Sequence, residues 1–148
     1  MAPSLRPLYT PAQISKYYDH ISLPHTHHIS TTAHQGPHTL LVTLTTLQKY
    51  NLASIPFENL SLHYSLHHTI SLDSEALYDK LVEKRRGGYC MENNCFFGTV
   101  LRTLGYDVCS VGARVNAAMD EKGGVERYVG WYVDIHFVLL AVVNVGGD

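Results

Sequence analysis

The chain has 148 residues, 45% hydrophobic and 16% charged, a composition typical of a folded protein with a real core and not of a disordered one. Its formal net charge of −2 gives no reason to expect nucleic acid or an anionic membrane as a partner. The longest apolar run, residues 137–143, is too short to span a bilayer, and residues 1–10 lack the apolar core of a signal peptide. With three cysteines and no such signal, the sequence predicts a soluble cytoplasmic protein with free thiols.

The first predicted helix begins at Pro11. Thr10 is suited to be its N-cap, Pro11 fits the first helical position, and Gln13 completes a capping box. Apolar residues at helical spacing predict one buried stripe before Pro24 closes the segment: Ile14, Tyr17, Tyr18 and Ile21.

Residues 24–38 are rich in His, Thr and Ser and predict a loop. The histidines raise the question of a metal site, but no cysteine or carboxylate joins them and no helical pairing fixes a geometry. A solvated polar loop is the plainer interpretation of this group: His25, His27, His28, His34 and His38.

Leucines at positions 40, 41, 44 and 47 predict a second helix that ends near residues 50–51. The segment IPFENL at 55–60 breaks the pattern, because Pro56 favours an extended Ile55. We expect a rigid connection with Phe57 buried. Residues 60–66 alternate apolar and polar side chains, which predicts a short strand or extended segment.

Two further helices are expected before residue 105. Asp73 suits the cap of the first, and basic residues 84–86 lie at its end, where the helix dipole favours them. The second follows the glycine pair 87–88, begins at Cys90 and stops at Gly105. The segment up to residue 105 is thus predicted to be mainly helical.

After residue 105 the pattern becomes that of strands. Cys109, Val111, Ala113 and Val115 are expected on the buried face of the first. A hairpin turn is predicted at residues 120–124, with further strands at 128–134 and 136–145. The last strand is apolar on both faces and expects neighbours, so the sequence predicts a truncated chain.

Cys90 is the candidate nucleophile. The unpaired N–H groups and the positive dipole end of a helix start favour a thiolate, and two preceding glycines allow tight or left-handed backbone that leaves the sulfur uncovered. A buried structural thiol is the alternative. Beyond Cys90 the chain has one histidine, His136, which is either its base or a core histidine. Cys95 and Cys109 are expected to be core residues.

These residues match a family signature. The sequence RGGYCMENN at residues 86–94 closely resembles the R-G-G-x-C-x-E-x-N motif of the arylamine N-acetyltransferases, and IPFENL at 55–60 resembles their (I/V)-P-F-E-N-L motif. The resemblance covers roughly residues 10–131 and is greatest to members from filamentous fungi.

The resemblance implies an α+β fold: an N-terminal helical bundle, then an antiparallel β-barrel with a papain-like thiol-enzyme core, then a lid. We therefore expect residues 1–105 to form a helical domain carrying the cysteine and residues 106–148 to form an incomplete β-barrel domain, with the lid absent.

The resemblance also implies the chemistry. An acetyl group from acetyl-CoA, or a malonyl group from malonyl-CoA, would pass through a Cys90 thioester to an arylamine or hydrazine, with no permanently bound cofactor and no metal. His136 would be the triad histidine, although it does not directly follow Gly130-Trp131 as the fungal pattern expects. No V-D-V-G-F-G motif supplies the triad aspartate, so weak activity is expected. Another papain-like thiol enzyme and a non-catalytic remnant that binds a partner are the alternatives.

Overall fold

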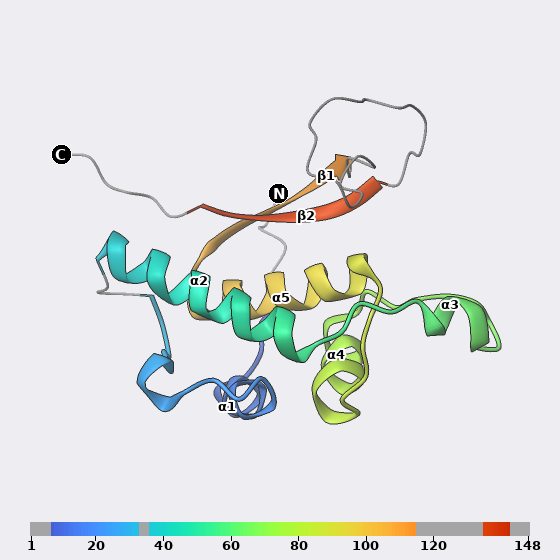
Figure 1. The fold of residues 1–148 in the computed structure, drawn as a ribbon, viewed down its shortest axis with the longest axis horizontal. Helices are drawn as coiled ribbons and strands as arrows, with labels where there is room; N and C mark the ends of the chain where they lie inside the picture. Colours follow the sequence, from blue (N-terminus) through green and yellow to red (C-terminus); the bar gives the residue numbers. More distant parts are fainter. Residues whose placement is uncertain (1–6, 33–35, 115–134, 143–148) are drawn as a thin grey trace, which may run out of the picture.

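The computed structural model describes residues 7–32, 36–114 and 135–142, with residues 111–114 and 135–142 given by their backbone. The elements follow the chain in this order: α1 (Pro11–His20), a 3₁₀ turn η1 (His25–His27), α2 (Pro37–Ser54), α3 (Leu60–Tyr64), α4 (Ser74–Tyr78), a π-helical turn η2 (Asp79–Glu83), α5 (Cys90–Leu104), β1 (Asp107–Arg114) and β2 (Ile135–Val142). Figure 1 shows the β1–β2 hairpin on one side of α5 and helices α1 and α4 on the other.

The predicted start of α1 is confirmed. The Gln13 N–H donates to Thr10 Oγ1 at 3.3 Å, and the Thr10 N–H donates back to Gln13 Oε1 at 2.8 Å. The stripe that includes Tyr17 and Ile21 is buried, and the Tyr17 hydroxyl donates to Asn51 Oδ1 of α2 at 3.0 Å. The capping box therefore fixes where the helix begins, and the stripe fixes which face packs.

Helix α2 begins earlier than predicted, at Pro37 inside the expected loop, because proline suits the first position of a helix as well as it suits a loop. It ends at Ser54, and Ile55 is extended with φ −110° and ψ 103°, as the following proline requires. The predicted break before the IPFENL segment is thus confirmed.

The extended segment expected at residues 60–66 is wrong. Residues 60–64 form the short helix α3, whose apolar side chains are largely exposed: Leu60 57%, Tyr64 83% and, just after it, Leu66 88%. A strand needs a neighbour to pair its N–H groups, whereas a helical turn pairs some of them internally, as the Ser65 N–H does with the Ser61 carbonyl. Figure 1 shows α3 projecting from the end of the molecule where α5 begins.

The two helices before residue 105 are confirmed. Asp73 Oδ1 accepts the Ala76 N–H at 3.0 Å and caps α4, which continues into η2. Helix α5 runs to Leu104 and ends at Gly105, whose φ of +98° lies in the left-handed region that glycine favours.

The core is built around the middle of α5. Phe96 is fully buried and its ring lies 5.7 Å from Tyr9, 5.5 Å from Tyr17 and 6.5 Å from Tyr78, centroid to centroid. It thus joins α5 to α1, to α4 and to the segment before α1.

The hairpin pairs β1 with β2 in antiparallel register, from Asp107 opposite Val142 to Arg114 opposite Ile135. The burial expected for Cys109 is wrong, since Cys109 is exposed and its neighbour Val108 is buried at 3% exposure. The strand begins at Asp107, two residues before the first residue of the predicted pattern, and Val108 takes the place in the core. The predicted turn at 120–124, the strand at 128–134 and the end of the last strand fall outside the described residues.

The described part of the chain is helix-rich with one hairpin, as expected for the first part of an α+β fold. In the residues that the structure describes, no helix has both the length and the apolar character needed to cross a membrane.

Candidate functional site

Cys90 is the first residue of α5, as predicted. Tyr89 before it is extended (φ −67°, ψ 161°), and its backbone N–H donates to Glu92 Oε2 at 2.9 Å, so a carboxylate in the first turn closes the helix start. Cys90 is only 7% exposed, which corrects the expectation of an uncovered sulfur. The segment at residues 55–60 is paired with Gly88, two residues before this end of α5.

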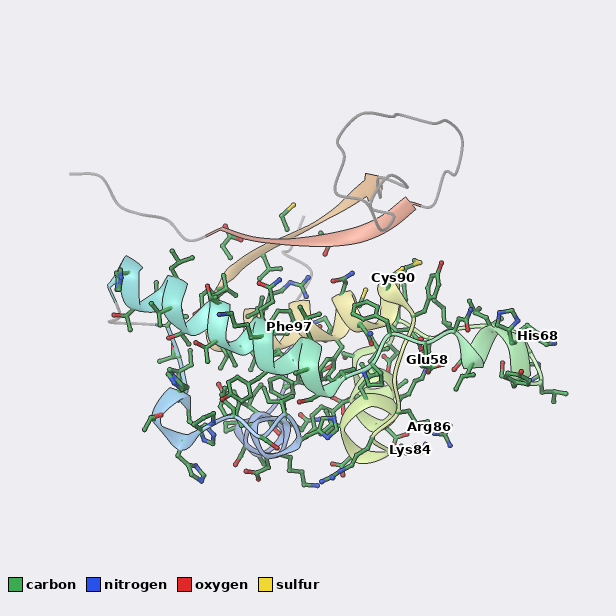
Figure 2. All side chains as sticks on the ribbon, viewed as in Figure 1. Glu58, His68, Lys84, Arg86, Cys90 and Phe97 are labelled. Atoms are coloured by element: carbon green, nitrogen blue, oxygen red, sulfur yellow. The ribbon has the colours of Figure 1, made fainter. Side chains whose placement is uncertain are left out.

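The two family motifs lie against each other. Phe57 and Gly88 form a parallel bridge in which the Gly88 N–H donates to the Pro56 carbonyl at 3.1 Å and the Glu58 N–H donates to the Gly88 carbonyl at 3.0 Å. The bridge fixes the position of Glu58 beside the start of α5, and Figure 2 shows Glu58 and Cys90 at this same end of the helix.

Gly87 and Gly88 are needed for space and not for left-handed backbone, since neither has a positive φ. A Cβ on Gly87 would lie 2.5 Å from the Pro56 carbonyl oxygen and 2.6 Å from Glu58 Cγ. A Cβ on Gly88 would lie 2.6 Å from Asn93 Oδ1. The prediction of a special role for this pair holds, but its physical reason is the close approach of the two segments.

Asn93 of α5 stabilises the same contact between the two motifs. Its side chain is buried, and Nδ2 donates to the Gly88 carbonyl at 3.1 Å and to the Pro56 carbonyl at 3.5 Å. Asn93 Oδ1 is buried without a hydrogen-bond partner among the described residues. One amide thus holds both motifs, a role that only the tertiary pairing reveals.

A pocket of about 370 Å³ opens beside the thiol and is lined by residues of both motifs: Phe57, Glu58, Asn59, Gly88, Tyr89 and Cys90. Phe57 is 56% exposed, so the expectation that it is buried is wrong. The bridge holds its backbone at the surface beside Gly88, and the side chain forms a wall of the pocket. Asn59 and Tyr89 line the pocket together with Phe57.

The pocket residue Glu58 belongs to a partly buried ionic cluster centred on Lys80 of η2. Lys80 Nζ lies 2.9 Å from both carboxylate oxygens of Glu92, 2.9 Å from Ser61 Oγ and 3.7 Å from Glu58 Oε1. For Arg86 the sequence leaves two interpretations open: a pair with Glu92 or Glu58 that holds the cysteine loop, or a solvated arginine at a helix end. Arg86 is exposed, as the second interpretation expects, and Figure 2 places it beyond Glu58 as seen from Cys90.

The sequence did not identify Lys80, because the local pattern does not show which side chains meet Glu92 and Glu58. The π-helical turn determines this. It places the Lys80 carbonyl 3.1 Å from the Arg86 N–H and the Lys80 side chain under the first turn of α5.

The other two thiols differ from Cys90 in setting. Cys95 packs at the edge of the core, and burial raises its thiol pKa, with a smaller lowering effect from Arg102. Cys109 is exposed on β1. Among the three cysteines, Cys90 is the one at a helix start and on the lining of this pocket.

His136 lies near the beginning of β2, where its Cα is paired with Ala113, and its side chain falls outside the described part of the chain. Helix α5, about 22 Å long, is followed at once by β1, about 26 Å long, and the hairpin packs on α5. The start of β2 therefore returns toward the Cys90 end of α5, as Figure 1 also shows.

The described histidines of residues 24–38 do not form a metal-binding group. No group of three or more His, Cys, Asp or Glu side chains suited to a metal ion occurs within the described ranges. His28 Nε2 lies 3.0 Å from the Leu23 carbonyl, and its ring packs on Tyr18 at 4.6 Å.

Comparison with known proteins identifies relatives along the whole chain. Residues 40–134 match the family model for N-acetyltransferase. The chain is 41% identical over 155 aligned residues to N-malonyltransferase FDB2 of Fusarium pseudograminearum, covering 95% of this chain and 45% of that protein. It is 43% identical over 103 residues to the arylamine N-acetyltransferase pineal gland isozyme NAT-3 of Gallus gallus, covering 70% and 32% respectively. The chain thus spans less than half the length of these curated relatives.

Solved structures give the same assignment. The arylamine N-acetyltransferase of M. tuberculosis superposes with a TM-score of 0.62 at 31% identity, over 91% of this chain and 44% of that one. The Mycobacterium marinum arylamine N-acetyltransferase in complex with CoA superposes with a TM-score of 0.61 at 33% identity, over 88% and 42%. Motifs, fold and relatives agree, and the chain belongs to the arylamine N-acetyltransferase family.

Proposed function

We propose that this chain takes an acyl group from a CoA thioester onto Cys90 and passes it to the nitrogen of an arylamine or hydrazine. The observation that supports this most directly is the position of Cys90: the first residue of α5, on the lining of a pocket of about 370 Å³ that both family motifs build. A thiol at a helix start is favoured as thiolate, which is the nucleophilic form.

The reaction proceeds in two steps. The Cys90 thiolate attacks the thioester carbonyl carbon, a bond forms between that carbon and Sγ, and the bond to the CoA sulfur breaks so that CoA leaves as its thiol or thiolate. The amine nitrogen then attacks the same carbon, the new C–N bond replaces the C–Sγ bond, and the thiolate is regenerated. His136 accepts the proton of the Cys90 thiol and returns it to the leaving CoA sulfur, so that CoA departs as its thiol; the neutral His136 then accepts the proton of the amine in the second step.

The acyl donor is acetyl-CoA or malonyl-CoA. The N-malonyltransferase relative aligns with nearly the whole chain, which supports malonyl as a candidate beside acetyl. The two donors differ by a carboxylate, so a direct comparison of the two thioesters decides between them.

Slow turnover is part of the proposal. The sequence has no aspartate in a V-D-V-G-F-G setting. Such a group would fix the tautomer of His136 and stabilise its protonated form. We therefore expect these 148 residues to be acylated on Cys90 but to complete few cycles.

The first prediction concerns the thioester. Incubation with acetyl-CoA or malonyl-CoA should add the mass of one acyl group, and peptide mapping by mass spectrometry should place that group on Cys90. The Cys90→Ser variant should remain unlabelled, whereas Cys95→Ser and Cys109→Ser, which remove the other two thiols, should label normally. His136→Gln should slow labelling. The matched control is His63→Gln, which removes a histidine that also lies near the pocket, hydrogen-bonded to Asn59 at 3.2 Å, but has no proposed role in the reaction.

Label on Cys95 or Cys109 in place of Cys90 would contradict the assignment of the nucleophile. A loss of labelling in His63→Gln with none in His136→Gln would contradict the assignment of the base. Cys90-dependent hydrolysis of peptide amides without acylation by either CoA thioester would favour another papain-like thiol enzyme.

A further inference from the structure

We infer that Lys80 is a positioning residue for Cys90: it neutralises the two carboxylates that build the cysteine turn, so that a thiolate can form beside them. The inference rests on the proposed role of Cys90 as nucleophile. Lys80 is not one of the residues that line the pocket; it acts through Glu92 and through the pocket residue Glu58.

Glu92 is the first member of the cluster and belongs to the cysteine turn itself. Its Oε2 accepts the N–H of Tyr89, the residue directly before Cys90, at 2.9 Å. A carboxylate in the first turn stabilises a helix start, because the helix dipole and the unpaired N–H groups attract it. The same negative charge, two residues from the thiol, opposes a second negative charge on Sγ. Glu92 therefore stabilises the first turn of α5 but disfavours the thiolate form of Cys90 in that turn.

Glu58 adds a second carboxylate from the other motif. It lines the pocket with Cys90, and the Phe57–Gly88 bridge fixes its backbone. Without a cation, the start of α5 would carry two carboxylates beside the developing thiolate.

Lys80 supplies that cation. Its ammonium lies 2.9 Å from each oxygen of Glu92 and 3.7 Å from Glu58 Oε1, and it donates to Ser61 Oγ at 2.9 Å. The side chains of Lys80, Glu92 and Glu58 are 16%, 3% and 19% exposed, so water screens their charges only in part. With Lys80 charged, the three groups carry one net negative charge in place of two.

In the part of the chain that the structure describes, few other charged or titratable groups lie beside this turn. On α3, His63 Nε2 lies 3.2 Å from Nδ2 of the pocket residue Asn59. Tyr89 lines the pocket beside Cys90, and Arg86, which precedes the glycines, is exposed. From the hairpin, β2 packs on α5 and brings His136 near this end. In the described part of the chain, Lys80 is thus the cation that lies against both carboxylates.

The test measures the pH dependence of Cys90 alkylation by iodoacetamide in the full chain, with peptide mapping to separate the three thiols. In Lys80→Met we expect the pH of half-maximal rate to rise by about one unit, so that the rate at neutral pH falls about tenfold, because an uncompensated carboxylate opposes the thiolate. Lys80→Arg keeps the charge and should stay within a few tenths of a unit of the unmodified chain. Glu92→Gln keeps an oxygen for the Tyr89 N–H and should lower the half-maximal pH.

The double variant Lys80→Met/Glu92→Gln should return the profile toward that of the unmodified chain. A merely structural role would change the rate at every pH through exposure of the thiol and leave the midpoint in place. An unshifted midpoint in Lys80→Met, or an equal shift in Lys80→Arg, overturns the inference. If Lys80→Met does not fold, Glu92→Gln decides alone, because a midpoint that fails to fall contradicts the role of its charge.

Alkylation also separates this inference from the proposed function. A chain that is never acylated by CoA thioesters but shows the expected alkylation shifts retains the Lys80 assignment and loses the transferase assignment. A chain that is acylated by CoA thioesters but shows no alkylation shift contradicts the Lys80 assignment alone.

Discussion

At the scale of single residues, the site depends on two glycines, positions that carry no side chain. Gly87 and Gly88 let the segment at residues 55–60 approach the start of α5 to hydrogen-bond distance. At Gly87 the obstacle to a larger residue is the Pro56 carbonyl, a backbone atom that is itself bonded to the Gly88 N–H. A side chain there cannot be accommodated by a simple change of rotamer.

We therefore expect Gly87→Ala to lower the free energy of unfolding by about 1–3 kcal/mol, the usual cost of overpacking. It should also make Cys90 more accessible to alkylation, because the segment paired with Gly88 is pushed away. Urea denaturation and the alkylation rate at fixed pH measure the two effects. The matched control is Gly36→Ala, where a Cβ meets nothing within 4 Å. Equal stability of the two variants would contradict the packing argument.

The sequence alone identified Cys90, both motifs and the glycine pair, because each is a local pattern with a local physical meaning. It misplaced Phe57 and did not identify Lys80 as the partner of Glu92 and Glu58. Both errors concern which groups meet across the junction, and that depends on the bridge and on the π-helical turn, for which the sequence has no local signal.

At the scale of secondary-structure elements, the end of α1 carries an unusual histidine. His20 is the last residue of α1, and neither of its ring nitrogens has a hydrogen-bond partner among the described residues. Burial lowers the pKa of His20, and the nearby Arg85 lowers it further. A positive charge at a helix C-terminus is usually stabilising, but at His20 burial and the nearby Arg85 disfavour the protonated ring.

The sign of the pH effect follows. Because the pKa of His20 is lower in the folded chain than its ordinary value of 6.5, the unfolded chain takes up a proton first as the pH falls. The contribution of His20 to stability is therefore present above pH 6.5 and is lost as the pH falls below it. We expect urea midpoints to drop between pH 7.5 and pH 5.5 less steeply in His20→Gln than in the unmodified chain. His67→Gln, at an exposed histidine, is the control, and an equal flattening in both variants would contradict the assignment to His20.

Elements with strong end signals were predictable. The capping box fixes α1, Asp73 fixes α4, and Gly105 fixes the end of α5. Residues 60–66 carry no such signal, and their alternation was taken for a strand although no partner strand exists for them among the described residues. The burial of β1 was misassigned by one residue, since a short alternating run fits either face and the packing against α5 decides.

At the scale of the whole molecule, aromatic rings hold the helices together. Phe96 contacts rings from three other parts of the chain and is fully buried. Phe96→Ala is expected to lower the free energy of unfolding by about 3–5 kcal/mol, because it removes the centre of the core and leaves a cavity.

The matched variant is Phe57→Ala, which removes the same side chain from an exposed position on the pocket wall. Its stability should change by less than about 1 kcal/mol, whereas acylation of Cys90 should slow because the pocket loses a wall. Thermal unfolding and the mass-spectrometric acylation rate separate the two variants. A large loss of stability in Phe57→Ala would mean that this ring belongs to the core after all.

The class of the fold was predictable because the change from helical to alternating pattern near residue 105 is abrupt. How the hairpin lies on α5 was not, since it depends on packing between segments that the pattern treats separately. The expected division into residues 1–105 and 106–148 and the expected incomplete barrel stay predictions.

The bridge between Phe57 and Gly88 rests on two backbone hydrogen bonds and joins segments that are distant in the sequence. The pocket exists only while this bridge is closed, because each segment supplies part of its lining. Any molecule that sits in the pocket therefore binds the closed form and stabilises it by mass action, in proportion to the logarithm of its concentration once it exceeds its dissociation constant. Ligand occupancy and the integrity of the fold are in this way one coupled equilibrium.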